Sequence, residues 1–339
     1  MGKVFLDFVL GGYIQRIGSF SEEENMKKNL FIVVLCLLMA FVTVSCEKEP
    51  VHEHTYTAEW KSDATNHWKE CSCGEKTEVA EHTFGENTVK DGKVVQICSV
   101  CNYKKEITEA VLVSTAEELK TALNGEATTI YLGNDIKVEE MLKINGGKTL
   151  TLDLNGKTIT NSKVWDGASS SANPYLIHVS GADTKLTVKG NGKVFADSSS
   201  LDSTKYTGNT IEDARLFAME VLEGATVTIE NGEFIGSGDC IYCHTGKVYI
   251  KDGKFSLQYD WLTTNYTGKF LLNCNNTNFK ASPRTADIVV TGGTFVGFNP
   301  ATGNGGAGAE TTFVADGYES VKTKESTGTT PAEWTVQKK

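Results

Sequence analysis

Cysteine and histidine are the side chains of this sequence best suited to chemistry, and one group of them has the spacing of a haem attachment site. Residues 239–246, DCIYCHTG, contain Cys240, Cys243 and His244, the pattern that binds a c-type haem through two thioethers and an axial histidine. The apolar alternation around them predicts a β-strand, in which residues i and i+3 face opposite sides. The two thiols therefore cannot both reach one haem, and we expect no haem. Cys243, with Cys274 at a similar place in a later strand, is predicted to be a small buried core residue.

A second group of cysteines and histidines lies in two similar segments between residues 51 and 106. One segment begins HTYTAEW at His54 and the other begins HTFGENT at His82, and each ends in a cysteine pair followed by Gly or Asn. A region this short, with few aliphatic clusters, cannot bury enough surface to fold unaided, so we expect a cross-link. The segments resemble the short His/Cys repeats found on surface proteins of gut bacteria.

Two chemistries can supply this cross-link. A tight turn brings two thiolates to one ion, and Gly74 or Asn102 supplies the left-handed residue after the turn, which predicts a zinc-ribbon-like module with one tetrahedral Zn²⁺. The candidate ligands are Cys71, Cys73, Cys98 and Cys101, or a mixture of these with His54 and His82. Two disulfides between the segments are the alternative, because exported proteins form disulfides. A filled four-ligand zinc site has no open position for substrate, so any zinc is expected to be structural.

An export signal precedes these segments. Residues 26–46, MKKNLFIVVLCLLMAFVTVSC, begin with two lysines after Met26, continue with an apolar run too short for a comfortable membrane span, and end in a small residue and Cys46. This ending resembles the lipobox of bacterial lipoproteins, in which the cysteine is acylated, and the charged residues after it are similar to the tether of Bacteroidota-type surface lipoproteins. The resemblance implies a lipid anchor in the outer membrane and exposure on the cell surface. We interpret residues 1–25 as an upstream extension from a start codon assigned too early.

The charge of the chain limits its possible partners, and its length limits the number of domains. The chain has 339 residues and a formal net charge of −10, and only Arg215 and Arg284 supply arginine after residue 46. Binding to nucleic acid requires clustered positive charge, so no nucleic-acid partner is expected. The length after the signal suits a small His/Cys module at 47–106 and a larger domain at 107–339.

Repeated strands dominate the larger domain. Each unit combines an alternating strand, an Asn-Gly, Asp-Gly or Gly-Gly turn and a shorter strand, as in TLTLDLNGKTI (149–159), KLTVKGNGKVF (185–195), TVTIENGEFI (226–235), KVYIKDGKFS (247–256) and DIVVTGGTFV (287–296). Three short strands per unit, recurring at about 20 residues plus insertions, predict the coils of a parallel β-solenoid. The pattern resembles the pectate-lyase-like right-handed parallel β-helix over residues 110 to about 320. This implies an all-β domain, closed by a C-terminal strand or hairpin.

Stacking these coils gives specific expectations for the cap and the core. Residues 114–125, STAEELKTALNG, predict an N-terminal capping helix that begins with a capping box of Ser114 and Glu117 and ends at Gly125. Two columns of residues are predicted to point inward: Leu152, Val188, Ile229, Ile250 and Val290, and Thr158, Val194, Phe234, Phe255 and Phe295.

The outward column beside the turn argues against catalysis. It reads Asp153, Lys189, Glu230, Lys251 and Thr291. Coils lie ~4.8 Å apart, so these opposite charges alternate up a ladder and neutralise one another. Lyases of the β-helix fold instead gather carboxylates for Ca²⁺ beside an Arg or Lys base. We therefore expect this column to be structural.

Aromatic residues gather in the insertions that interrupt the coils, at 161–174, 197–214, 257–268 and 298–310. All the insertions follow the short strand, so we expect them on one side of the solenoid, where solenoids commonly bind. Aromatic rings among Asp, Asn and Thr suit stacking on sugars, and the candidates are Trp165, Tyr206, Tyr259, Trp261 and Tyr266. The alternative is that these rings fix the insertions to the coil surface.

These observations predict a non-catalytic surface lipoprotein, similar to an adhesin, that binds a glycan or another cell-surface partner. The alternative is a polysaccharide lyase or glycoside hydrolase of the same fold, with Asp166, Asp202, Asp213 and Asp260 as acid–base candidates. Two unpaired carboxylates ~5–10 Å apart would favour the glycosidase.

Overall fold

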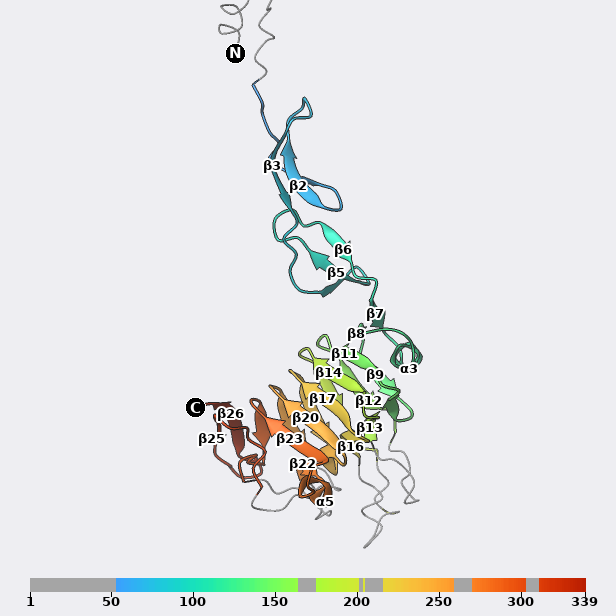
Figure 1. The fold of residues 1–339 in the computed structure, drawn as a ribbon, viewed down its shortest axis with the longest axis vertical. Coiled ribbons are helices and arrows are strands. Elements are labelled where there is room, and N and C mark those ends of the chain that lie inside the picture. Colours follow the sequence, from blue (N-terminus) through green and yellow to red (C-terminus); the bar gives the residue numbers. More distant parts are fainter. Residues whose placement is uncertain (1–52, 164–174, 201–203, 205–215, 259–269, 303–310) are drawn as a thin grey trace, which may run out of the picture. The chain divides into compact units, whose positions relative to one another are not determined.

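The computed structural model describes residues 53–163, 175–200, 204, 216–258, 270–302 and 311–339 (Figure 1). These residues divide into two units, 53–61 with 67–80 and 62–66 with 81–339, so the second His/Cys repeat belongs to the larger unit. Strands predominate, and the described helices are α3 (Ala116–Asn124) and α5 (Asn276–Phe279). At nine and four residues, neither described helix is long and apolar enough to cross a bilayer, which takes about 20 residues.

Each His/Cys repeat forms a small three-stranded sheet. The first contains β1 (Lys61–Ser62), β2 (Asn66–Glu70) and β3 (Lys76–Glu81), and the second contains β4 (Thr88–Lys90), β5 (Lys93–Ile97) and β6 (Lys104–Glu106). A two-residue turn joins β4 to antiparallel β5, and Asp91 and Gly92 adopt φ angles of 53° and 74° there. Positive φ at both positions is what a tight hairpin requires. Only two side chains of β5, Val94 and Val95, are fully buried, so this sheet has a thin core.

Three parallel sheets form the rest of the larger unit. The five-stranded sheet contains β10 (Leu142–Ile144), β13 (Tyr175–Ser180), β16 (Phe217–Leu222), β19 (Asp239–Cys243) and β22 (Phe270–Cys274). The seven-stranded sheet contains β7 (Ala110–Val113), β8 (Thr129–Leu132), β11 (Thr149–Asp153), β14 (Lys185–Lys189), β17 (Ala225–Ile229), β20 (Gly246–Ile250) and β23 (Ala286–Val290).

The eight-stranded sheet adds β9 (Ile136–Val138), β12 (Thr158–Asn161), β15 (Lys193–Phe195), β18 (Glu233–Gly236), β21 (Lys254–Leu257), β24 (Thr294–Val296), β25 (Tyr318–Lys324) and β26 (Glu333–Lys338). From β8 to β24, paired neighbours are three strands apart in the chain, so the chain runs through the three sheets in turn (Figure 1). The last two strands form an antiparallel hairpin against β24. The fold is all-β and solenoid-like, with parallel sheets as predicted.

One inward column is confirmed in register and the other needs a one-residue correction. Pairing aligns Leu152, Val188, Ile229, Ile250 and Val290, and all are buried. The second column begins with Ile159, not with Thr158, because Ile159 pairs with Val194 and is fully buried. Beyond Val194 the rings of Phe234, Phe255 and Phe295 stack at centroid distances of 5.4 and 5.1 Å.

Helix α3 packs on the first strands of the solenoid, as predicted, but its cap is shifted by one residue. Thr115 is the N-cap and Glu118 completes the capping box, in place of the predicted Ser114 and Glu117. The helix ends at Gly125, and it contributes Leu119 and Leu123 to the same core as the sheets.

Three of the insertions connect the same two sheets. The segments 162–174, 196–216 and 258–269 each lead from a strand of the eight-stranded sheet to the next strand of the five-stranded sheet. The same step after β18 takes only residues 237–238, which join β18 to β19. The inserted chain therefore enters the five-stranded sheet at the beginning of β13, β16 and β22.

Candidate functional site

The first His/Cys repeat brings three metal-binding side chains together. His54 Nδ1 lies 3.3 Å from Cys73 Sγ, and the ligand atoms of His54, Cys71 and Cys73 all lie within 4.8 Å of one another. A backbone bridge between Tyr56 and Cys71 holds the histidine segment beside the cysteine turn. Gly74 follows the turn with a φ of 90°, which confirms the left-handed residue predicted there.

The second repeat builds the same arrangement from different sequence. His82 Nδ1 lies 3.4 Å from Cys101 Sγ, and the ligand atoms of His82, Cys98 and Cys101 lie within 4.8 Å of one another. The equivalent bridge joins Phe84 to Cys98. Asn102, with a φ of 60°, takes the left-handed position that Gly74 has in the first repeat. The cysteine spacing differs by one residue, yet the three ligands converge in both repeats.

Hydrogen bonds favour the thiolate form of Cys98. Burial opposes the charge, but hydrogen bonds from the backbone N–H groups of Cys101 and Val100 lower the pKa of Cys98 to about 6. Burial raises the pKa of the neighbouring Cys101 thiol. The thiolate is the form that binds a metal, so Cys98 is prepared for coordination near neutral pH.

The His82 ring is oriented by a second contact. Its Nε2 lies 2.9 Å from the backbone oxygen of Asp63, and a carbonyl can only accept a hydrogen bond. Nε2 therefore carries the proton, and Nδ1 presents its lone pair beside Cys101. Metal-binding histidines commonly donate their other N–H to a carbonyl in this way. The carbonyl also raises the pKa of His82, so a proton competes with a metal for Nδ1 at low pH.

The structure groups the predicted ligands by repeat. The sequence predicted one ion held by Cys71, Cys73, Cys98 and Cys101, or by a mixture of these with His54 and His82. In each repeat the structure brings one histidine and two cysteines together, because each histidine segment bridges back to the cysteine turn of its own repeat. All four cysteines are thiols in the structure. The groups lie close enough to hold a metal ion.

The cysteines of the haem-like pattern lie in the core. Cys243 pairs in register with Cys274, and both are fully buried, as expected. The Cys243 thiol donates to the backbone oxygen of Gly246 at 3.3 Å. Cys240 is also fully buried, and burial raises its pKa. His244 stacks on Tyr242, with ring centroids 5.8 Å apart.

The sequence patterns did not predict a row of polar side chains that lies on the five-stranded sheet. Strand pairing aligns Lys143, His178, Glu220, Tyr242 and Asn273, each next to inward core residues and therefore facing away from the core. His178 Nδ1 lies 2.8 Å from Glu220 Oε2, and Glu220 is only 5% exposed. The sequence carried a signal for this row, because polar residues interrupt otherwise apolar strands such as YLIHV and LFAMEV.

A buried carboxylate and several aromatic rings extend this polar row. Asp239, 1% exposed, accepts hydrogen bonds from the Phe270 backbone N–H at 2.9 Å and from Asn273 Nδ2 at 2.6 Å. Phe217 lies between two tyrosines, 5.1 Å from the Tyr175 ring centroid and 6.0 Å from that of Tyr242. The five-stranded sheet therefore carries carboxylates, a histidine and aromatic rings together.

The predicted sugar-binding and acid–base residues lie outside the described residues. These are Trp165, Tyr206, Tyr259, Trp261 and Tyr266, and Asp166, Asp202, Asp213 and Asp260. Cys46, the predicted lipidation site, also lies outside them. The outward column of charged residues lies within the described residues, and its opposite charges form ion pairs as predicted. Lys189 Nζ lies 3.6 Å from Asp153, and Lys251 Nζ lies 3.1 Å from Glu230.

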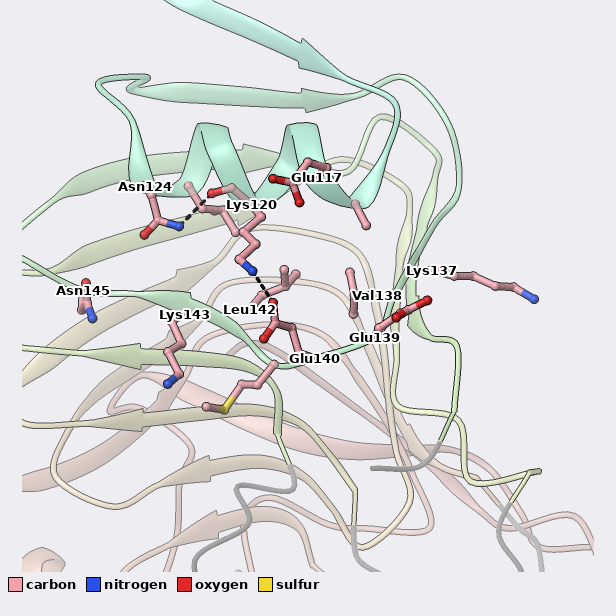
Figure 2. A pocket seen from close by; sticks show the side chains of 13 residues that line it. Glu117, Lys120, Asn124, Lys137, Val138, Glu139, Glu140, Leu142, Lys143 and Asn145 are labelled. Carbon is pink, nitrogen blue, oxygen red and sulfur yellow. Dashed lines mark hydrogen bonds and ion pairs between the residues drawn. The ribbon is translucent and has the colours of Figure 1, made fainter. Parts of the chain in front are cut away.

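A pocket of about 550 Å³ lies between α3 and the β9–β10 connection (Figure 2). Three glutamates and three lysines line it, namely Glu117, Glu139, Glu140, Lys120, Lys137 and Lys143. Figure 2 shows the Lys120 ammonium directed at Glu140, with which it forms an ion pair, while Lys137 points away from that pair. The carboxylates and ammonium groups balance, so the pocket does not favour a ligand of either charge.

In comparisons with known proteins, the chain matches no family model, no curated protein and no solved structure. Function is therefore inferred from these residues and their geometry.

Proposed function

We propose that the protein is a lipid-anchored surface protein whose parallel-sheet domain is a right-handed β-helix that binds a glycan. The anchor is Cys46, at the end of a signal that resembles that of Bacteroidota-type lipoproteins. The protein is exposed on the outer membrane, and binding does not involve catalysis.

The observation that carries the glycan proposal is the route of the insertions into one sheet. Three of them enter the five-stranded sheet at β13, β16 and β22. These strands bear His178, Glu220 and Asn273 on the face away from the core. Sugar sites combine aromatic rings with a few fixed polar groups, and the insertions contain Tyr259 and Trp261 beside Asp and Thr.

The metal of the His/Cys repeats is proposed to be a structural Zn²⁺. Mixed histidine and cysteine ligands are the donor set that zinc prefers. The repeats bury few apolar residues, so metal binding would contribute to their folding.

The proposed site is tested by calorimetric titration of the variant Tyr259→Ala/Trp261→Ala beside wild type, with a glycan selected on an array. Each stacked ring contributes about 1 kcal/mol, so losing two should weaken binding about thirtyfold. Thermal melts should hardly change, because the described core is filled without these residues. Retained affinity with a lower melting temperature would assign both rings to packing. Cleavage of the glycan during titration would favour the lyase or hydrolase alternative.

The lipid anchor is tested on cells with the same glycan. Cells that express wild type should bind the glycan at their surface. Cells that express Cys46→Ala should lose this binding, while the variant protein purified from them keeps its affinity. Unchanged surface binding by the Cys46→Ala cells would contradict a lipid anchor at this residue.

A further inference from the structure

We propose that the protein binds two separate zinc ions, one in each His/Cys repeat, through His54, Cys71 and Cys73 and through His82, Cys98 and Cys101. This deepens the proposed structural role of zinc and rests on it. A single shared ion, the arrangement that the sequence favoured, would need ligands from both repeats.

Ligand geometry supports one ion per repeat. With Zn–S of about 2.3 Å and Zn–N of about 2.0–2.1 Å, tetrahedral coordination separates sulfur and nitrogen by roughly 3.5 Å. The Nδ1–Sγ distances are 3.3 Å between His54 and Cys73 and 3.4 Å between His82 and Cys101. A histidine and a cysteine of each repeat are therefore spaced as ligands of one ion.

The backbone of each repeat is built around its own ligands. A bridge pairs the first cysteine with the residue two after the histidine, Tyr56 with Cys71 and Phe84 with Cys98. The amide of that cysteine donates across the turn as well, from Cys71 to Glu75 at 2.8 Å and from Cys98 to Tyr103 at 2.9 Å. The same backbone contacts thus place a histidine beside a cysteine pair in both repeats, which favours one ion per repeat over a single shared ion.

In the second repeat, further contacts hold the His82 ring in an orientation suited to metal binding. His82 donates through Nε2 to the Asp63 carbonyl, which directs Nδ1 towards Cys101. The ring also stacks on Tyr103, with centroids 4.5 Å apart and an interplanar angle of 12°. A ligand whose tautomer and plane are both fixed loses little freedom when it binds an ion.

The two sites differ in access to solvent. His54 and Cys73 are exposed, whereas His82 and Cys101 are half-buried, and the first cysteine is buried in both repeats. A chelator reaches exposed ligands more readily, so the first repeat should release its ion faster. Binding replaces thiol protons with zinc and releases them to solvent, so both affinities should fall at acid pH.

The test is zinc stoichiometry of the full chain purified in detergent, measured by elemental mass spectrometry after incubation with zinc alone. Wild type should hold about two ions, Cys73→Ser about one, Cys101→Ser about one, and the double variant none. Ser72→Ala and Ser99→Ala are matched controls, because each lies beside a ligand in the same turn, and both should retain two. Removal of zinc from wild type by a chelator should be biphasic, and the fast phase should be absent in Cys73→Ser.

The outcomes separate this inference from the zinc proposal on which it rests. About one ion in wild type, lost completely in either cysteine variant, would overturn two separate sites while leaving zinc as the metal. Wild type without zinc, and with disulfides found by mass spectrometry, would overturn the zinc proposal itself. If Cys73→Ser unfolds the first repeat, His82, Cys98 and Cys101 should still hold one ion, so the prediction remains testable.

Discussion

Asp197 links successive strands of the eight-stranded sheet where the insertions begin. Its carboxylate accepts hydrogen bonds from the Ser199 backbone N–H at 2.8 Å and from Gln258 Nε2 at 2.9 Å. Its backbone exchanges hydrogen bonds with the Asn161 amide, both at 2.7 Å. Burial opposes the charge, but hydrogen bonds from Ser199 and Gln258 lower the pKa of Asp197 below its ordinary value of 3.8.

Asp197→Asn should lower the melting temperature near neutral pH and matter less in acid. The folded-state pKa is depressed, so the ionised carboxylate stabilises the fold above the unfolded pKa of about 3.9, and this contribution is lost as the pH falls through the folded value. Melts of both proteins between about pH 7 and pH 3 measure the effect. A difference that stays constant over this range would contradict a role for the charge.

Single residues also show where sequence reasoning reaches its limit. Alternation predicted the inward face of β11 correctly, but it placed Thr158 in the column that Ile159 occupies. The turn after β11 has one residue more than the turn after β14, and Asn155 and Gly156 take left-handed φ angles of 47° and 73° within it. The alternation of a strand does not reveal how many residues the next turn contains. Both strands were therefore predicted correctly, but the position of the second strand relative to the first was wrong by one residue.

Among the elements, α3 was predicted by its apolar spacing and by the glycine at its end. The error at its start has a physical reason, because Ser114 and Thr115 are both good N-cap residues and both are followed three residues later by glutamate. In the structure the Thr115 hydroxyl accepts from the Glu118 backbone N–H at 3.2 Å. Glu118 in return accepts from the Ser114 and Thr115 backbones.

Thr115→Ala should therefore destabilise the larger unit by about 1 kcal/mol, because it leaves an N-terminal N–H of the helix without its cap. Ser114→Ala is the matched control, since it removes a hydroxyl one residue earlier, and its effect should be within about 0.5 kcal/mol of zero. Chemical denaturation of both variants measures the difference. Equal losses, or a larger loss for Ser114→Ala, would contradict the cap seen in the structure.

For the whole molecule, the sequence predicted architecture better than it predicted sites. Repeated strands and turns fix which side chains face inward, because every coil must fill the same core. The polar row of His178, Glu220 and Asn273 depends instead on which strands become neighbours, and the paired residues, such as His178 and Glu220, are far apart in the chain. The insertions lack any period, so their residue types suggest a ligand without placing it.

The two parts of the chain also differ in what holds them together. The larger unit has one continuous apolar core that extends from Val113 to Val336. In the repeats the buried apolar residues are few, with Trp68 and Cys71 in the first and Val94, Val95 and Cys98 in the second. Burial of this size does not offset the conformational entropy of folding, so the repeats should depend on their ligand groups.

Metal removal should therefore loosen the repeats and leave the parallel sheets intact. After chelation, we expect backbone amides in the strands between 66 and 106 to exchange hydrogen faster, because local opening no longer has to release an ion. Amides of β13, β16 and β19 should keep their protection, since their core lacks any metal-dependent contact in the described residues. Hydrogen exchange followed by mass spectrometry measures both regions in one sample, and adding zinc back is the control for reversal. Unchanged exchange in the repeats would show that they fold without metal, and faster exchange in all three sheets would show that the solenoid depends on them.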